Sequence, residues 1–567
     1  MNTPKKERES VRKQIMPFGE SVLFKKSKSF LNSLQNRVIP FVLTHKLFFI
    51  LLISGILALA TRVYYSFSLR GGYFYSGDAY GIFLRAFFVS KGYLSPRAIY
   101  LWNVPPLILF LNAIVMKFLP MDPVMAVRFL CSIMTTASVL VLVAIVCRYT
   151  DALTSLFFGM LLALNPFFSF VSTEPEKAPF VVFFFALGFL FLFKYRDNFP
   201  KGEKKYLAWS FVFFMLMMLS YPETGIFFLI SGIFIYVLFS WSTKFEDQKK
   251  WKILLDPYLY VLTLAGISCF FLRFIPEMLI GFKSQYQEIA AAGGSVAKTA
   301  VKGVLFNLRN LFSSNIAASR FMIHIKDHVG VVIFVFSILG LLIFILERRE
   351  RGSPEKESQG AWFIWAFVIF VLFAVQWWCY SHDSRYPYYL IPPIMFFAAV
   401  AVSWFSKKLS LSGIRFVALI ITLLLIFSFY QIQKLRSDVF LTYRTRMAAQ
   451  AKTAEELLHE VKIKRGDGVI ALGWPSFIYA LVKDEPGREK DLYFVGWGSV
   501  DLDVFSLDFI KRRNIRYFVY DAAGSDYYDT PIKLLERFST MKGLIIVPIH
   551  RVTEGNFYGD IYYLEYD

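Results

Sequence analysis

Long apolar segments recur along most of the chain, and short clusters of basic residues separate many of them. A helix needs about 20 mostly apolar residues to cross the hydrocarbon core of a bilayer. By this criterion the sequence predicts about eleven transmembrane helices. They cover residues 47–68, 124–147, 152–172, 178–196, 206–220, 222–241, 254–275, 329–346, 361–380, 386–405 and 413–431.

The basic clusters follow every second predicted span, namely the fourth, sixth, eighth and tenth. Cytoplasmic loops carry an excess of Lys and Arg, so we place these four loops and the basic N-terminal arm, residues 1–46, in the cytoplasm. The loop residues are Lys194, Arg196, Lys201, Lys204 and Lys205; Lys244, Lys249, Lys250 and Lys252; Arg348, Arg349 and Arg351; and Lys407, Lys408 and Arg415.

The apolar stretch from Pro105 to Pro120 does not fit this alternation. It is short for a full crossing, and a span there would move every later basic loop to the outer face. We therefore interpret it as a helix that dips in from the outer side or lies along the interface.

The last part of the chain, from about residue 436, is mixed and polar. It alternates runs of β-type residues with helical stretches, and a capping-box pattern, Thr453-x-x-Glu456, predicts the start of the first helix. The predicted strands are Gly468–Leu472, Leu492–Gly496, Arg516–Tyr520, Leu544–Ile549 and Ile561–Tyr566. The fold class predicted is thus a polytopic α-helical membrane domain, residues 47–432, followed by a soluble α/β domain on the outer side, residues 433–567.

Composition supports a membrane protein. Hydrophobic residues make up 56%, charged residues only 18%, and the mean hydropathy is +0.49, which exceeds the apolar content of soluble globular proteins. The net charge of +20 resides mostly in the arm and the short loops, which favours anionic lipid headgroups over nucleic acid as the partner. The 4 cysteines show no metal-binding spacing.

Ionisable residues gather near the predicted outer ends of the spans. They are Asp78, Glu174, Glu176, Glu223 and the cluster His382-Asp383-Ser384-Arg385. Such groups are costly at membrane depth and usually mark a polar cavity or a substrate path. A carboxylate there can act as general base, and Arg, Lys or His can hold a phosphate.

Each of the acids also has a purely structural interpretation. Asp78 could cap the helix that follows it, because Asp is a favoured N-cap residue. Glu174 and Glu176 flank Pro175, which is typical of a solvated turn. Their placement on one predicted side, rather than any single residue, favours a site.

The same holds for the later residues. Glu223 follows a proline and could lie in a first helical turn, where the helix dipole favours a carboxylate. Arg385 beside Tyr386 could be an interfacial anchor.

Several short motifs follow one another along the membrane part of the sequence. They are Asp78…Tyr80…Ala86…Gly92, Pro105-Pro106-Leu107, Arg128 at the head of the next span, Tyr221-Pro222-Glu223, and Arg385-Tyr386 leading into Ile391-Pro392-Pro393. This order resembles the polyprenyl-phosphate-sugar-dependent glycosyltransferases of the GT-C superfamily, with protein O-mannosyltransferases and lipid A aminoarabinose transferases most similar.

The resemblance implies an inverting glycosyltransferase of a bacterial inner membrane whose site faces the periplasm. It implies a polyprenyl-phosphate sugar as donor and a glycan, lipid or protein as acceptor. Asp78 would be the catalytic base or orient the acceptor, and Glu174 or Glu176 would be a second catalytic acid. No cofactor is expected, and a divalent metal stays open because the sparse acids form no evident site.

The sequence also departs from the family pattern. No second acid follows Asp78 directly, and Val104 precedes Pro105 where relatives often carry a polar or basic residue. Donor-phosphate contacts would then come from elsewhere, including basic residues of the segment 276–328. The substrate-binding candidates are Tyr80, Arg85, Lys91, Arg97, Glu223, His382, Arg385 and Tyr386.

Two other classes stay open. A transporter or flippase of lipid-linked sugars is one, although no inverted repeat or pair of broken helices is evident in the two halves. A non-catalytic protein with the same fold is the other.

Overall fold

The computed structural model describes the larger part of the chain. The described residues are 45–68, 74, 77–93, 105–197, 203–221, 264, 267, 329–351, 386–408, 423, 430, 439–472, 475–495, 505–521 and 530–566. The N-terminal arm up to residue 44 lies outside them. So do the predicted spans 222–241, 254–275, 361–380 and 413–431, apart from four isolated positions, 264, 267, 423 and 430.

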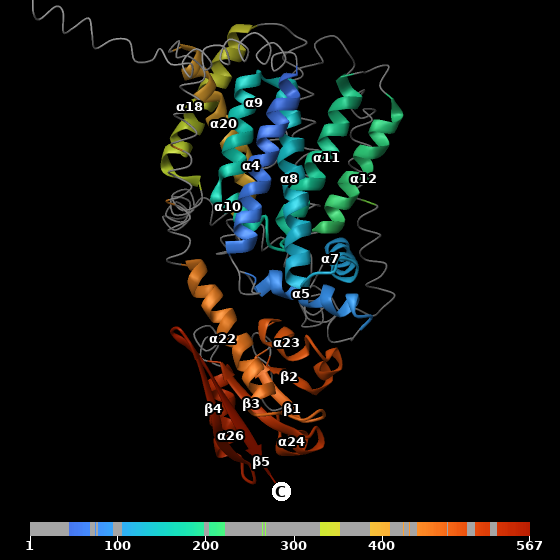
Figure 1. Ribbon diagram of the computed structural model, residues 1–567, viewed down its shortest axis with the longest axis vertical. Coiled ribbons are helices and arrows are strands. Elements are labelled where there is room, and N and C mark those ends of the chain that lie inside the picture. The colour runs from blue at the N-terminus through green and yellow to red at the C-terminus, as the bar shows by residue number, and fades with distance from the viewer. Residues whose placement is uncertain are drawn as a thin grey trace, which may run out of the picture.

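A bundle of helices runs along the long axis of the molecule (Figure 1). Its members are α4 (Lys46–Ser68), α8 (Pro123–Tyr149), α9 (Ala152–Leu164), α11 (Lys177–Asp197), α12 (Lys204–Ser220), α18 (Val331–Arg351) and α20 (Ile391–Lys408). Within the described residues, 4 segments are long and apolar enough to cross a membrane: Lys46–Phe67, Pro123–Tyr149, Lys177–Tyr195 and Tyr388–Lys408. The predicted membrane helices at these positions are confirmed.

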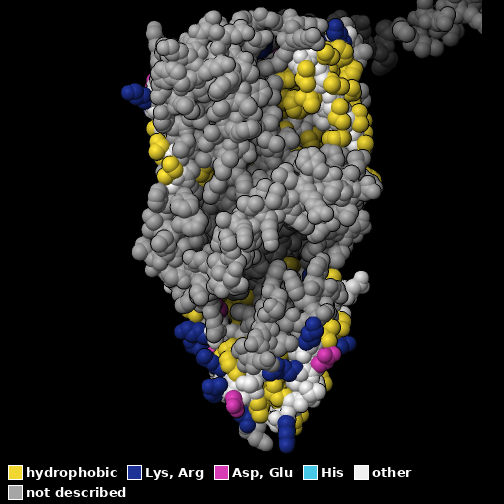
Figure 2. Space-filling model, turned by 180° about the vertical axis from the view of Figure 1, so that it is seen from behind, with side chains coloured by type: hydrophobic (Ala, Val, Ile, Leu, Met, Phe, Trp, Pro, Cys, Tyr) yellow, Lys and Arg dark blue, Asp and Glu magenta, His cyan; other side chains and the backbone are white. Residues whose placement is uncertain are grey.

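The bundle helices leave apolar surface uncovered. On α4, Phe48 and Ile56 are about as exposed as residues on a protein surface, and Val332 and Leu346 on α18 are equally exposed. Figure 2 shows hydrophobic side chains gathered over the upper part of the molecule, whereas Lys and Arg gather near the lower end. Such a band of exposed apolar side chains suits contact with lipid.

The predicted span 152–172 is wrong as one helix, because the chain breaks at Asn165 into α9 and α10 (Pro166–Val171). Pro166 has no N–H to donate and excludes the α conformation from the residue before it. Asn165 instead caps α10, accepting a hydrogen bond from the Phe168 N–H at 2.7 Å. The carbonyl of Ala163 is satisfied by the hydroxyls of Thr61 and Ser169, as a break at membrane depth requires.

Two short helices, α5 (Gly77–Ser90) and α7 (Pro106–Phe118), lie at the lower end of the bundle in Figure 1. The 13 residues of α7 extend about 20 Å at 1.5 Å per residue, less than the hydrocarbon thickness. α7 packs against α5 and α8 and is not among the long apolar helices. A short helix is therefore present here as predicted, and its interpretation as a helix that does not cross the membrane stays a prediction.

The C-terminal domain, residues 439–566, contains a five-stranded sheet of order β2-β1-β3-β5-β4. β1 (Gly468–Leu472) is parallel to β2 (Leu492–Val495) and β3 (Ile515–Asp521), and β5 (Phe557–Glu565) is antiparallel to β3 and β4 (Ile545–Glu554). The predicted α/β class is confirmed. The predicted strands are found, although β3, β4 and β5 are longer than their apolar runs.

Helices cover both faces of this sheet. α22 (Val439–His459) lies on one face, where the Thr453 side chain packs against Gly559 and Gln450 donates to Asp521. α26 (Thr530–Thr540) lies on the other, where Phe538 packs edge-on against Phe518. The predicted helix start at Thr453 is wrong, because Thr453 lies inside α22 and its hydroxyl donates to the Ala449 carbonyl one turn back.

Two further described helices lie between the parallel strands. α23 (Pro475–Val482) follows β1, and α24 (Leu507–Arg512) precedes β3. α23 also packs against α5 of the membrane domain, so the C-terminal domain sits on the end of the bundle that carries α5 and α7 (Figure 1). We refer to this end as the domain-facing end.

Candidate active site

Glu174 and Glu176 lie in the turn between α10 and α11, at the domain-facing end. Their relative exposures are 1% and 5%, so the interpretation as a solvated turn is wrong. The turn is closed by its own backbone, because the N–H of Glu176 donates to the Glu174 carbonyl at 2.7 Å. Two carboxylates are thereby buried within one short turn.

Arg128 is the cation that faces this turn. Its Nη2 lies 3.6 Å from Oε1 of Glu174, and both side chains are 1% exposed. Arg128 stands in the second turn of α8, which begins after the N-cap Asp122. Because water is excluded from both partners, the loss of either would leave an uncompensated buried charge.

An aromatic cluster ties α5 to this ion pair. The guanidinium of Arg128 lies over the ring of Phe74, 5.4 Å from its centroid. Phe74 in turn contacts Tyr80 edge-on at 5.2 Å and Phe83 at 4.9 Å, both from α5. The helix that carries Asp78 is thus packed against the Arg128–Glu174 pair.

Asp78 itself is placed by its backbone. α5 begins at Gly77, so Asp78 lies in the first helical turn, where the helix dipole stabilises a carboxylate. Arg85 follows two turns later and is buried, and Tyr80 is fully buried. Lys91 lies just beyond the other end of α5, about 20 Å along the helix from Asp78, and is exposed.

A second polar group lies deeper in the bundle. Arg62 of α4 is fully buried, and its Nε donates to the hydroxyl of Thr135 at 2.9 Å. The hydroxyl of Ser172 lies 3.1 Å from that of Tyr388, and Thr135 also contacts the Ser172 carbonyl at 3.5 Å. The four side chains come from four segments that are far apart in the sequence.

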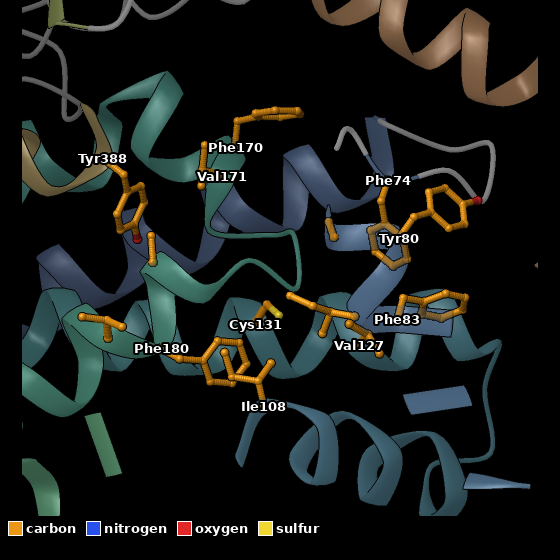
Figure 3. Packing of buried hydrophobic residues seen from close by; sticks show 14 of the residues in the cluster. Phe74, Tyr80, Phe83, Ile108, Val127, Cys131, Phe170, Val171, Phe180 and Tyr388 are labelled. Atoms are coloured by element: carbon orange, nitrogen blue, oxygen red, sulfur yellow. The ribbon is translucent and has the colours of Figure 1, made fainter. Parts of the chain in front are cut away.

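The two groups share one face of α8. Arg128, Cys131 and Thr135 follow at three- and four-residue intervals, so they lie above one another on that face. Figure 3 shows Phe74, Tyr80 and Phe83 on one side of Cys131 and Tyr388 on the other. The described site is therefore a buried polar strip that leads from the domain-facing end into the bundle.

Sequence reasoning missed Arg62 and Tyr388 as members of the site. The signal for Arg62 was its place inside an apolar span, where an arginine is rare and usually functional. Tyr388 follows the predicted Tyr386 by two residues, in the short 3-10 helix Tyr386–Leu390 that precedes α20. Only the backbone of Tyr386 and of Asp78 is described.

Four other candidates, Arg97, Glu223, His382 and Arg385, lie outside the described residues. Tyr221, the last described residue before Glu223, lies at this end. The ammonium group of Lys177, next to Glu176, lies 4.5 Å from the ring centroid of Tyr221. Within the described part of the chain, no three His, Cys, Asp or Glu side chains form a cluster suited to a metal.

The family model for dolichyl-phosphate-mannose-protein mannosyltransferases matches residues 103–269, which include Arg128, Glu174 and Glu176. Among solved structures, ArnT from Cupriavidus metallidurans bound to undecaprenyl phosphate is similar with a TM-score of 0.53 and 12% identity, covering 89% of this chain and 97% of that chain. The chain has the GT-C fold.

The oligosaccharyltransferase from Archaeoglobus fulgidus, tethered to an acceptor peptide, is a second neighbour with this fold. Its TM-score is 0.50 at 13% identity, covering 90% of this chain and 73% of that chain. No curated protein matches the sequence. The resemblance to the GT-C superfamily, inferred from motif order, is confirmed.

Proposed function

We propose that this membrane protein is an inverting glycosyltransferase that moves a sugar from a polyprenyl-phosphate donor to an acceptor hydroxyl or amide at the outer face. The buried Arg128–Glu174 pair, packed through Phe74 against the helix that carries Asp78, carries the proposal. ArnT with bound undecaprenyl phosphate supports a lipid-phosphate donor, and the peptide-tethered oligosaccharyltransferase supports an acceptor substrate.

Buried arginines suit the leaving group of such a reaction. When the bond from the sugar to the donor phosphate breaks, negative charge develops on the phosphate oxygens. Arg62, Arg85 and Arg128 are all at least nine-tenths buried on the helices of this end, so water does not weaken their field. Arg85 belongs to α5 and Arg128 packs against it through Phe74, and we assign the donor phosphate to these two arginines.

The carboxylates suit the other half of the reaction. Asp78 accepts the proton of the acceptor as the acceptor oxygen or nitrogen bonds to the anomeric carbon. The carbon–oxygen bond to the phosphate breaks on the opposite face of the sugar, which inverts the anomeric configuration, and the polyprenyl phosphate leaves with the electron pair. No cofactor takes part in this balance.

The two glutamates take different roles in this proposal. Glu174 lies against Arg128 and orients its guanidinium, as a carboxylate partner does for a buried arginine. Glu176, two residues further along the same turn, is the second acid near the reacting groups. Loss of Glu174 should therefore weaken donor binding, and loss of Glu176 should slow sugar transfer.

We place the N-terminus in the cytoplasm and the C-terminal domain in the periplasm or outside the cell. The end of the bundle opposite the domain carries Lys407 and Lys408, in agreement with the positive-inside rule. The donor tail would lie along the apolar helices, with its phosphate at the domain-facing end.

The test uses the full-length protein in lipid nanodiscs and a panel of undecaprenyl-phosphate sugars. One donor should raise the unfolding temperature more than free undecaprenyl phosphate does, because a ligand at 100 times its Kd adds about 2.7 kcal/mol of stability. The same donor should be consumed when an acceptor extract is added. If no donor exceeds the free lipid phosphate and none is consumed, the proposal is wrong.

Three matched variants separate the assigned roles. Glu174→Gln should reduce donor stabilisation, because Arg128 loses its orienting charge. Glu176→Gln should slow transfer and leave donor stabilisation unchanged. Glu203→Gln, an exposed glutamate before α12 at the opposite end, should change neither.

A further inference from the structure

Tyr479 of the C-terminal domain packs against α5 of the membrane domain. Tyr479 of α23 lies edge-on between two rings of α5, with centroid distances of 4.8 Å to Phe83 and 5.2 Å to Phe87. The interplanar angles of 77° and 89° are those of favourable edge-to-face pairs. Figure 1 shows α23 directly against α5.

A continuous run of contacts leads from this tyrosine to the ion pair. Phe83 packs on Phe74 at 4.9 Å, and Phe74 lies under the guanidinium of Arg128 at 5.4 Å. Arg128 then pairs with Glu174. Phe83 and Phe74 are fully buried, so the run is close-packed over its whole length, and close-packed interiors transmit displacements.

α5 lies between the membrane domain and the C-terminal domain. It is a short helix at the end of the bundle, and among the described elements its main packing partners are α7 and α23. Asp78 stands five residues before Phe83 on the same helix. A shift of α5 by 1 Å would therefore move the proposed base by a similar distance, which is enough to slow a reaction strongly.

Tyr479 acts at this interface by packing and not by charge. Burial, together with the nearby carboxylates of Asp122 and Asp484, raises the pKa of Tyr479, so the phenol stays neutral at physiological pH. Asp122 is also the N-cap of α8, the helix of Arg128. The tyrosine thus lies near the start of α8 and packs against the middle and the C-terminal half of α5.

We infer that Tyr479 is a positioning residue, through which the C-terminal domain holds α5 and its Asp78 in register with the Arg128–Glu174 pair. The inference rests on the proposed function for its kinetic test but not for its structural test. It gives the C-terminal domain a role in catalysis that needs no contact between that domain and the sugar.

The kinetic test compares Tyr479→Ala with Tyr479→Phe in the full-length protein. The alanine variant should lose at least about tenfold in kcat, equivalent to about 1.4 kcal/mol, with KM for the donor within twofold. The phenylalanine variant keeps the ring and should recover activity to within twofold of the wild type. Tyr493→Ala, which removes a ring packed on Phe509 within the same domain, should leave kcat unchanged.

The structural test measures amide hydrogen exchange of residues 77–90 in the same variants. Exchange in α5 should be faster in Tyr479→Ala than in the wild type, and unchanged in Tyr479→Phe and Tyr493→Ala. Unchanged exchange and kcat in Tyr479→Ala would overturn the inference, as would an equal loss in Tyr493→Ala. If the wild type transfers no sugar, the proposed function fails, and the exchange experiment still decides the role of Tyr479.

Discussion

Removal of one charge from the Arg128–Glu174 pair should destabilise the protein strongly. The two side chains are 1% exposed and 3.6 Å apart, which corresponds to an attraction of ~5 kcal/mol at an effective dielectric constant of ~20. Arg128→Met leaves a buried carboxylate without this cation, and Glu174→Gln leaves a buried guanidinium without this anion. We expect each variant to lose about 3–5 kcal/mol of unfolding free energy.

The double variant distinguishes the ion pair from simple loss of packing. Removing both charges leaves neither partner uncompensated, so the double variant should lose less than the sum of the two single losses, by about 2–3 kcal/mol. Equilibrium unfolding of the full-length protein in mixed micelles measures these differences. The exposed pair Lys452–Glu554, with an N–O distance of 3.3 Å, is the control, and its coupling should stay below about 1 kcal/mol.

Additive losses at Arg128 and Glu174 would refute this reasoning. The same is true if each single variant lost less than about 1 kcal/mol, which is the range of solvated surface pairs. In either case water would reach the pair, and the site would not be the water-excluded environment that strengthens its charges.

Two further predictions concern the rest of the bundle. Asp151 caps α9, and its carboxylate lies 2.9 Å from the ammonium group of Lys407. Burial acts to raise the pKa of Asp151, but the hydrogen bonds from Lys407 and Thr154 outweigh it and hold this pKa below its usual value. The stability that Asp151 contributes is therefore present above about pH 4 and lost as the pH falls further. Asp151→Ala should lower the unfolding free energy by about 0.5–2 kcal/mol and remove this pH dependence of the unfolding midpoint. An unchanged pH profile in the variant would contradict this. In α18, a Cβ on Gly340 would lie 1.7 Å from the Phe397 carbonyl oxygen of α20. Gly340→Ala should therefore cost about 1–3 kcal/mol or more of unfolding free energy through overpacking and lower the unfolding temperature, whereas Gly487→Ala, whose Cβ would have its nearest atom at 3.5 Å, should not. Equal effects of the two variants would show that α18 and α20 are not in close contact.

The helices and strands could be predicted because each reflects a local pattern. The predicted strand Gly468–Leu472 has the same bounds as β1, and α8 extends the predicted span 124–147 by one residue at its start and two at its end. The break at Asn165 was missed because hydropathy counts apolar side chains and ignores backbone geometry. Pro166 indicated this break, because a proline disfavours the α conformation in the residue before it.

The location of the site could be predicted only in part. Charge alternation between loops placed Glu174 and Glu176 on the same side as Asp78, and the structure brings their turn and α5 to the same end. Their burial could not be foreseen from the Glu-Pro-Glu sequence, which is compatible with a solvated turn. It results from the packing of α8 and α11 around the turn.

The partners of the buried polar groups could not be predicted. Arg62 and Thr135 are 73 residues apart in the sequence, and Ser172 and Tyr388 are 216 residues apart. Such pairs depend on which helix faces come together in the bundle, and no local pattern encodes that choice. Thr453 shows the same limit, because a capping-box pattern can occur inside a longer helix.

The role of Asp78 is the central claim, and turnover by Asp78→Asn tests it most directly. The variant is isosteric and keeps a hydrogen-bonding side chain in the first turn of α5. We predict that transfer of sugar from the preferred donor falls by about 10²–10⁴-fold. The rise in unfolding temperature caused by that donor should persist, because the donor phosphate is assigned to arginines. Turnover within a few-fold of the wild type would contradict the account, since the proposed base would then be unnecessary.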